Sequence, residues 1–394
     1  MQRRSFLGMI GGVGASAALP LATAVADEKP LAMPSAADRA ASDPLSLPRV
    51  RATPDRIISL TVCTRPFRES GPRIESEKLG RKTIVHNYGH GGSGWSLSWG
   101  SSQLAVDQAA KTGVREIAVI GCGALGLTSA LLAQRAGMKV RIYAKDLPPY
   151  TRSTFATGSW TPNSRFCTEA GATPEVVERW IWMVRHSHRM YQNLLGLPGD
   201  PIEWRDGYQL SEQPFHPERR RDREGEPRYP ELEKLVRDLK PRTQELAPGS
   251  HPFAAPYVRR QTNMVFNISS YARMLYSDFL LAGGIVEVRE FNSPGELARL
   301  KEKTLINATG YGARALFGDE SIIPVRGQLM RLVPQPEVIY GLSYDNKVSM
   351  TPRRDGLVVQ SNEKNDFNNT DAAPDRAAAE RSVQILSAIV DRMS

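Results

Sequence analysis

The sequence predicts an α/β fold that contains a Rossmann-like dinucleotide-binding domain. An apolar run at 115–120 leads directly into the glycine pattern Gly121-Cys122-Gly123-Ala124-Leu125-Gly126, and a helical stretch and a second apolar run follow at 127–136 and 139–144. Strand, glycine turn, helix and strand in this order form a βαβ unit. The 394 residues, of which 41% are hydrophobic, suffice for one large domain or two ordinary ones.

Each glycine of this turn has a physical role. Gly121 allows the tight turn, Gly123 lets the backbone approach a pyrophosphate, and Gly126 lets the helix pack closely on the strand. The helix N-terminus supplies amide donors to the phosphates. The acidic residue that would bind a ribose is missing after the second strand, because Lys145 stands there and Asp146 follows one residue late. This departure argues against a plain NAD dehydrogenase.

Two further segments have the composition of a ligand site. The glycine-rich run at 86–95 lies between a predicted strand at 82–85 and a predicted helix at 99–110, and its small residues let backbone atoms approach a planar ligand. A short buried strand beginning at Thr304 ends in Ala308-Thr309-Gly310. Either segment alone would be an ordinary loop or strand end.

Charge and cysteine content exclude several classes of function. The net charge of +9 is moderate, and acidic residues are scattered among the basic ones, so we predict no nucleic-acid partner. The three cysteines, Cys63, Cys122 and Cys167, are too few and too widely spaced for a disulfide framework. No histidine or cysteine spacing fits a metal site, so we predict no metal.

The N-terminus has the pattern of an export signal. Arg3-Arg4 precedes a Gly/Ala/Leu-rich stretch that ends in the cleavage-like Ala24-Val25-Ala26. We therefore predict a twin-arginine signal peptide at 1–26, a flexible linker at 27–54, and export to the periplasm or beyond by the twin-arginine machinery. After cleavage we expect a soluble protein with no stable membrane insertion, folded around its cofactor before export.

Taken together, these motifs resemble those of the D-amino-acid oxidase family of FAD enzymes. The resemblance implies a Rossmann-like FAD-binding domain plus a smaller α+β substrate domain with an antiparallel sheet. It also implies FAD as cofactor. The residues that match the family's FAD-binding motifs are Gly121, Gly123, Ala124, Leu125, Gly126, Thr151, Arg152, Ser153, Gly158, Ser159, Thr309, Gly310, Gly91, Gly92, Ser93, Gly94, Trp95 and Ser96.

The order of the motifs implies a circular permutation. The family's signature, here at 86–94, normally lies near the C-terminus, but in this chain it precedes the dinucleotide turn. Permutation is tolerated where chain ends are close together at the surface. We expect substrate-domain segments at 55–83, 171–266 and 326–394, and FAD-domain segments at 84–170 and 267–325.

The resemblance also implies a substrate site. Arg65 matches the arginine that binds the substrate carboxylate, Tyr344 matches one of two active-site tyrosines, and the Gly92 carbonyl would accept a hydrogen bond from the amine. Val348 or Met350 stands where the second tyrosine is expected. The implied activity is oxidation of D-amino acids or related amino carboxylates, with O2 as acceptor and H2O2 as product. Two alternatives stay open: an exported dehydrogenase that uses a quinone or another carrier, and a flavin-binding protein with a decayed site.

Overall fold

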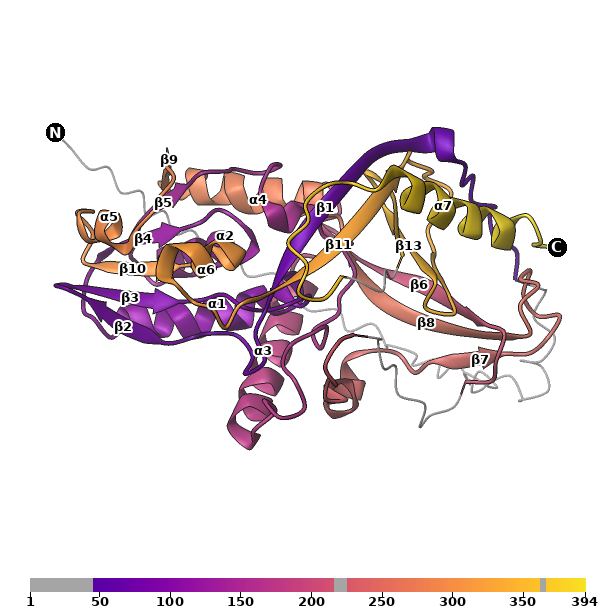
Figure 1. Cartoon of the computed structure of the whole chain (residues 1–394), viewed down its shortest axis with the longest axis horizontal. Helices are drawn as coiled ribbons and strands as arrows, with labels where there is room; N and C mark the ends of the chain where they lie inside the picture. The colour runs from indigo at the N-terminus through magenta and orange to yellow at the C-terminus, as the bar shows by residue number, and fades with distance from the viewer. Residues whose placement is uncertain (1–44, 216–224, 362–365) are drawn as a thin grey trace, which may run out of the picture. The chain divides into compact units, whose positions relative to one another are not determined.

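The computed structural model describes residues 45–215, 225–361 and 366–394. Pro44–Ser394 forms one compact unit. This unit is built on two β-sheets, a six-stranded sheet and an eight-stranded sheet (Figure 1). The signal peptide predicted at 1–26 lies outside the described residues.

The six-stranded sheet is a parallel sheet with one antiparallel edge. Its strands, in spatial order, are β2 (Ser76–Leu79), β3 (Lys82–His86), β10 (Thr304–Asn307), β4 (Glu116–Ile120), β5 (Lys139–Ala144) and β9 (Ile285–Val288). Only β2 runs antiparallel to its neighbour. The central strands are almost wholly buried, as expected for a parallel sheet that is covered on both faces.

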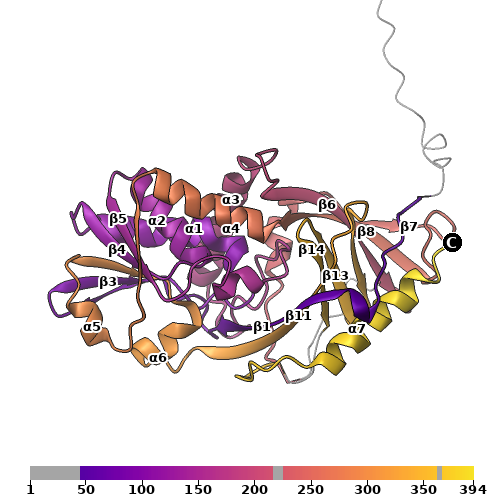
Figure 2. The ribbon, with the colours of Figure 1, turned by 90° about the horizontal axis from the view of Figure 1, so that it is seen from above.

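Helices cover both faces of this sheet, and the alternation of side chains along β4 explains why. Ile117 and Val119 pack into one apolar cluster with helices α1 (Gly94–Ala110), α2 (Ala124–Arg135), α3 (Pro174–Gln192) and α4 (Ile268–Leu281). Ala118 and Ile120 point to the opposite face, into a smaller cluster with α5 (Pro294–Ala298) and α6 (Ala313–Phe317). Figure 2 shows the two helical layers on either side of the sheet.

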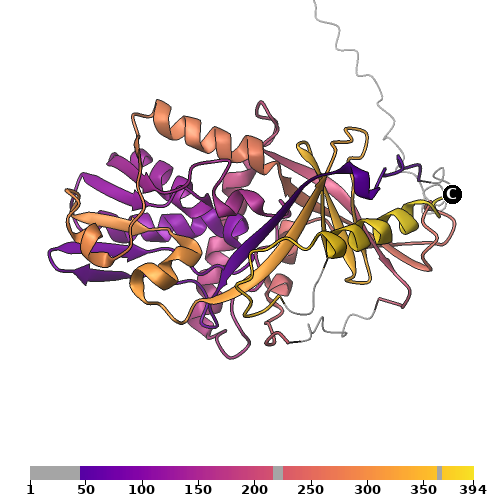
Figure 3. The same ribbon diagram turned by 45° about the horizontal axis from the view of Figure 1, so that its top comes forward.

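The eight-stranded sheet is antiparallel except where β12 meets β6. Its strands, in spatial order, are β1 (Ile57–Phe67), β11 (Ile323–Leu332), β14 (Gly356–Ser361), β13 (Val348–Arg353), β12 (Gly341–Tyr344), β6 (Ile202–Ser211), β8 (Tyr257–Phe266) and β7 (Gln244–Leu246). Helix α7 (Arg376–Val390) packs on one face and forms an apolar cluster with it (Figure 3).

The 3₁₀ helices of the described residues are η1 (Pro54–Arg56), η2 (Arg152–Phe155), η3 (Leu232–Leu239) and η4 (Gly310–Gly312).

The fold moves two of the predicted boundaries. The predicted substrate segment 55–83 was too long, because β2 and the first two residues of β3 fall inside it and pair in the six-stranded sheet. The predicted substrate segment 171–266 likewise includes α3, whose apolar face packs on α1. The composition of a short apolar strand does not indicate which sheet it will join, so these boundaries could not be placed from the sequence alone.

The predicted linker at 27–54 was also wrong in its last part. Val50 and Ala52 are only 5% and 2% exposed and pack into the cluster beneath α7. The Tyr340 hydroxyl donates to the Pro48 carbonyl at 2.7 Å. Residues 45–53 therefore belong to the folded body, and their Pro- and Arg-rich composition concealed two buried apolar positions.

Two predictions concern the cysteines and the absence of a membrane-spanning segment. Cys63, Cys122 and Cys167 are buried and free, in agreement with the absence of a disulfide framework in the sequence. Across the three described ranges, no helix has the length and apolar character needed to span a bilayer.

Candidate active site

A cavity of about 820 Å³ lies where the carboxyl ends of β4, β5 and β10 face the eight-stranded sheet. Its volume is that of a site for a cofactor-sized ligand. In an α/β sheet, ligands bind at the carboxyl ends of the strands. The fold therefore places the cavity where the glycine motifs converge.

The dinucleotide turn is packed so tightly that only glycine fits at two positions. Gly121 has a φ of +109°, and a Cβ added there would lie 2.6 Å from the Ala308 carbonyl oxygen. A Cβ on Gly126 would lie 2.1 Å from the Gly121 oxygen. The Ala124 amide at the start of α2 donates to Ser153 Oγ at 3.0 Å, which ties η2 to the turn.

The second glycine segment, 91–94, is fixed against the chain on both sides. The Gly91 amide donates to the Pro66 carbonyl at 2.7 Å, and the Gly92 amide donates to the Ser164 carbonyl at 3.0 Å. A Cβ on Gly92 would lie 2.4 Å from Ser164 Oγ. This loop therefore joins β1, which carries Arg65, to the start of α1.

Other glycines face empty space in the cavity, and this suits a bound FAD. Gly94 and Gly310 both line the cavity, yet a Cβ on either would meet no protein atom within 4 Å. Their missing side chains leave room for a ligand instead of for the protein. The α2 N-terminus supplies donors for a pyrophosphate. The residues present thus fit FAD, which the turn at 121–126, η2 and the loop at 91–94 would hold.

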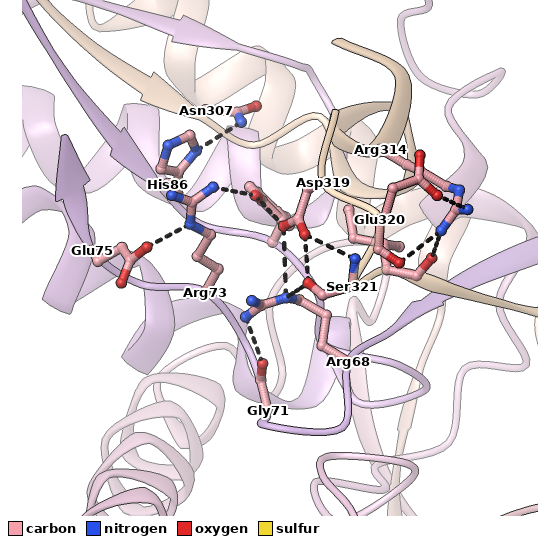
Figure 4. A network of polar contacts seen from close by, with 12 residues as sticks. Arg68, Gly71, Arg73, Glu75, His86, Asn307, Arg314, Asp319, Glu320 and Ser321 are labelled. Atoms are coloured by element: carbon pink, nitrogen blue, oxygen red, sulfur yellow. Dashed lines mark hydrogen bonds and ion pairs between the residues drawn. The ribbon is translucent and has the colours of Figure 1, made fainter. Parts of the chain in front are cut away.

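A buried chain of polar contacts supports the strand end Ala308-Thr309-Gly310, and Figure 4 shows its contact between Asn307 and His86. Thr309, which lines the cavity, donates to Asn307 Oδ1 from its amide at 3.2 Å and its hydroxyl at 2.7 Å. Asn307 Nδ2 lies 3.0 Å from His86 Nδ1, and His86 Nε2 lies 3.1 Å from a Glu77 carboxylate oxygen. Burial and the charge of Arg73 lower the pKa of His86. A neutral His86 would accept from Asn307 at Nδ1 and would carry its proton on Nε2, on the side of the Glu77 carboxylate.

The same network joins distant parts of the chain. Arg73 donates to the Tyr88 hydroxyl at 3.0 Å, and Tyr88 donates to Asp319 at 2.6 Å. Arg68 donates to Ser321 Oγ at 2.8 Å (Figure 4). Burial is the main cause that raises the pKa of Tyr88, so it stays a phenol. The network therefore fixes the segment before the glycine loop to the segment after β10.

Arg65 lies in the cavity wall. A backbone carbonyl fixes its guanidinium, but no carboxylate of the described residues neutralises the charge. Its Nη1 donates to the Arg326 carbonyl at 2.8 Å. The group lies over Gly327, where a Cβ would come within 2.2 Å of Nη2. Within the described ranges Arg65 has no carboxylate partner, and its remaining donors can bind an anionic ligand.

The structure does not bring Tyr344 into the cavity. Its hydroxyl donates to Glu212 at 2.8 Å, a bond that raises the pKa of Tyr344. Side chains alternate along a strand, and Tyr344 lies on the face that packs toward α7. The same alternation puts the side chains of Val348 and Met350 in that apolar cluster and the side chain of Ser349 on the opposite face, and all three residues contribute to the cavity lining. The sequence reading missed Ser349, although period-two alternation along 348–351 could have indicated it.

The missing acid after β5 has a structural counterpart. Lys145 and Asp146 line the cavity, and Lys145 Nζ lies 3.1 Å from a carboxylate oxygen of Glu290, which follows β9 and also lines the cavity. The sequence reading missed Glu290 because it is far from the turn in the chain. A carboxylate is thus present at this end, but it is paired with a lysine.

Most of the sequence-predicted site residues gather around the one cavity. Gly126 and Ser93 lie behind it, since Gly126 packs on the turn and the Ser93 hydroxyl donates to the His90 carbonyl at 2.7 Å. No group of three potential metal ligands occurs in the described part of the chain. The predicted residues that line the cavity are Arg65, Gly91, Gly92, Gly94, Trp95, Ser96, Gly121, Gly123, Ala124, Leu125, Thr151, Arg152, Ser153, Gly158, Ser159, Thr309 and Gly310.

Comparison with known proteins gives a consistent result. The family model DAO, FAD dependent oxidoreductase, matches residues 116–393. A D-amino-acid oxidase from Rubrobacter xylanophilus is 29% identical over 71% of this chain and 78% of its own length. A D-amino-acid oxidase from Dictyostelium discoideum is 26% identical over 68% and 72%. Among solved structures, iminodiacetate oxidase from Chelativorans sp. BNC1 aligns with a TM-score of 0.48 and 14% identity over 70% of this chain and 79% of that one.

Proposed function

The chain belongs to the DAO family of FAD-dependent oxidoreductases, and on this premise we propose that it oxidises the amine of D-amino acids or related amino carboxylates. The observation that carries the proposal is Arg65, a guanidinium without a carboxylate partner in the described residues of the cavity wall. A planar guanidinium can bind a carboxylate through two parallel hydrogen bonds. A substrate with a free carboxylate is therefore the best match to this wall.

The residues around Arg65 orient this substrate. Because Gly327 has no side chain, the Arg65 guanidinium can lie directly over it. Arg65 Nη1 donates to the Arg326 carbonyl, which fixes the orientation of the group. Since the Gly92 amide already donates to Ser164, the Gly92 carbonyl is the group that this loop offers to a substrate amine. Positioning of this kind supplies much of the rate in a reaction that needs little acid or base.

When bound, FAD would supply the two-electron oxidation chemistry at the substrate Cα, with O2 as the final electron acceptor. The protein then releases an imino acid, which water converts to a keto acid and ammonia. One amino acid, one O2 and one water thus give one keto acid, one ammonia and one H2O2. The chain's residues act on the substrate by binding and orientation, and none is required as a general base.

The acceptor and the stereochemistry are tested together. Purified holoprotein is mixed with D- and L-amino acids, and flavin bleaching under anaerobic conditions and H2O2 formation in air are recorded. We expect bleaching and H2O2 with D-amino acids. Bleaching without H2O2, together with reduction of an artificial acceptor, would identify a dehydrogenase. A holoprotein that no amino carboxylate bleaches would be a flavin-binding protein with a decayed site, an outcome that the engagement of Tyr344 by Glu212 makes worth testing.

We infer that the chain is a circular permutant of its family. The family model begins at residue 116, at β4, and leaves out β1 and β3, yet β1 pairs with β11 and β3 pairs with β10. The ends of the folded body are adjacent, since Arg49 donates to the Met393 carbonyl. A chain reordered as 113–394 followed by 45–112 should fold and bind FAD. An insoluble or flavin-free reordered chain would contradict the inference.

We also propose that residues 1–26 direct export of the folded protein by the twin-arginine route. The support is the Arg3-Arg4 pattern and the cleavage-like Ala24-Val25-Ala26. Fused to a reporter that works only after folded export, this segment should give a periplasmic signal. Replacing both arginines with lysine should abolish the signal, and an unchanged signal would contradict the proposal.

A further inference from the structure

The face of the eight-stranded sheet that lines the cavity carries a row of polar side chains, one from each of four neighbouring strands. Ser349 on β13 pairs with Gln360 on β14 and with Ser343 on β12, and Ser343 pairs with Gln209 on β6. All four line the cavity. Residues directly opposite on adjacent strands have their Cβ atoms about 5 Å apart. We call these four residues the polar row.

Three members of the polar row lack protein partners. The side chains of Gln360, Ser349 and Ser343 form no hydrogen bond in the part of the chain that the structure describes, although each is half-buried. By contrast, Thr351, on the same cavity-facing side of β13, lies 3.0 Å from Ser159 Oγ. A polar group that loses water without gaining a partner destabilises a complex. These three side chains therefore need a hydrogen-bonding ligand when the cavity fills.

The end of the row is fixed by Arg259. Its Nε and Nη2 both donate to the Gln209 side-chain oxygen, at 2.9 and 2.7 Å. Because a guanidinium has no acceptor, the oxygen must face it, and the amide nitrogen points elsewhere. The orientation of Gln209 is thus set by a contact within the protein, before any ligand binds.

The polar row itself carries no formal charge. The nearest charged side chains on β6 are already engaged: Arg205 pairs with Glu203, and Asp206 accepts from Thr262 at 2.6 Å. The guanidinium at the end of the row, Arg259, already donates to Gln209 and is not part of the cavity lining, so a charged ligand group at the row would lose hydration without direct contact with an opposite charge. An apolar group would leave the amides and hydroxyls unpaired.

We propose that the polar row is the subsite for the substrate's side chain and that it selects side chains that are neutral and hydrogen-bonding, such as carboxamides and hydroxyls. This proposal rests on the proposed function and adds the class of substrate. Arg65 on β1 binds the carboxylate in this arrangement, and the side chain extends across the sheet face toward Gln360 and Ser349, the members of the polar row on the strands nearer to β1.

The test uses pairs of D-amino acids that match in shape and differ in polarity. Values of kcat/KM are measured for D-asparagine against D-leucine and for D-threonine against D-valine, with D-alanine as reference. We expect the polar member to be favoured about tenfold or more in each pair, as for one or two additional hydrogen bonds. In the double variant Ser349→Ala/Gln360→Met, this ratio should fall to within about twofold of one.

Controls separate this proposal from the proposed function. Gln103→Met makes a similar change on α1, away from the cavity lining, where the Gln103 side chain donates to Asp107, and it should keep the wild-type ratio. If the double variant does not fold, Ser343→Ala replaces it in the test. This smaller change should also lower the preference for the polar member of each pair. Equal or better use of D-leucine and D-valine by the wild type would overturn the side-chain subsite and leave the oxidase function standing. Failure of all five compounds, D-alanine included, to bleach the flavin would overturn the proposed function itself.

Discussion

The two walls of the cavity differ in how their polar and backbone groups are engaged. On the cofactor side, a Cβ added to Gly91, Gly121 or Gly126 would lie only 2.0 to 2.6 Å from a backbone carbonyl oxygen. Behind these glycines, Asn307 contacts both His86 and Thr309 through its side chain. On the substrate side, Arg65 and three members of the polar row lack side-chain partners in the described residues. The comparison teaches that the cofactor wall is complete in the protein alone, whereas the substrate wall is completed by its ligand.

The largest effect is expected on the substrate wall. Arg65→Ala should lower kcat/KM for D-amino acids by about 100- to 1,000-fold, because two charge-assisted hydrogen bonds to the carboxylate are lost. Flavin content and thermal stability should stay close to wild type. Gly327→Ala is the matched variant, since it keeps the charge and displaces the guanidinium. Wild-type kinetics in Arg65→Ala would remove this residue from the site.

The cofactor wall should respond in the opposite way. Gly126→Ala places a Cβ 2.1 Å from the Gly121 oxygen, and such overpacking should lower the free energy of unfolding by about 3 kcal/mol and reduce FAD retention. Gly94→Ala is the control, because its Cβ would meet no protein atom. It should weaken FAD binding without destabilising the apoprotein. Urea unfolding of the apoproteins and flavin content after gel filtration provide the measurements. Equal apoprotein stability of the two variants would contradict the account.

A smaller difference should separate two polar truncations. Asn307→Ala leaves the Thr309 amide and hydroxyl and the His86 ring without their partner, and it should cost about 2 kcal/mol of unfolding free energy. Ser343→Ala removes a hydroxyl that bonds to nothing in the described chain, and it should stay within about 0.5 kcal/mol of wild type. Denaturant unfolding measures both. Similar losses in the two variants would erase the distinction between the walls.

This difference also explains how far the sequence could lead. The cofactor wall was predictable, because Gly121, Gly126 and Gly310 occupy positions that only glycine tolerates or that leave room for a ligand. The family and its FAD cofactor follow from those motifs and are confirmed. On the substrate wall, Arg65 was predicted but the polar row was not, because which face of β12 and β13 meets the cavity depends on sheet pairing. Tyr344 and Ser349 differ in place only by this alternation.

A pH dependence of stability is a further expected difference. Burial lowers the pKa of His86, and it lowers the pKa of His90 to about 3. A histidine with a lowered folded pKa takes up its proton more readily when unfolded. Its stabilisation is therefore full above about pH 6.5 and is lost as the pH falls below that value.

Each such histidine adds up to about 1.4 kcal/mol per pH unit to this slope between the unfolded and folded pKa values. Unfolding free energy measured from pH 7.5 to 4.5 should therefore fall. His90→Asn should show a shallower fall than wild type, whatever its stability at pH 7.5. An identical slope would show that His90 is not neutral and buried in solution.

The central claim is that the cavity holds FAD on one wall and an amino carboxylate, bound by Arg65, on the other. The most direct measurement is the visible spectrum of the purified protein during anaerobic titration with D-alanine, for wild type and Arg65→Ala. The account predicts a flavin spectrum in both proteins, with bleaching at low D-alanine concentration in the wild type only. A colourless wild-type protein, or equal bleaching of the two proteins, would contradict it.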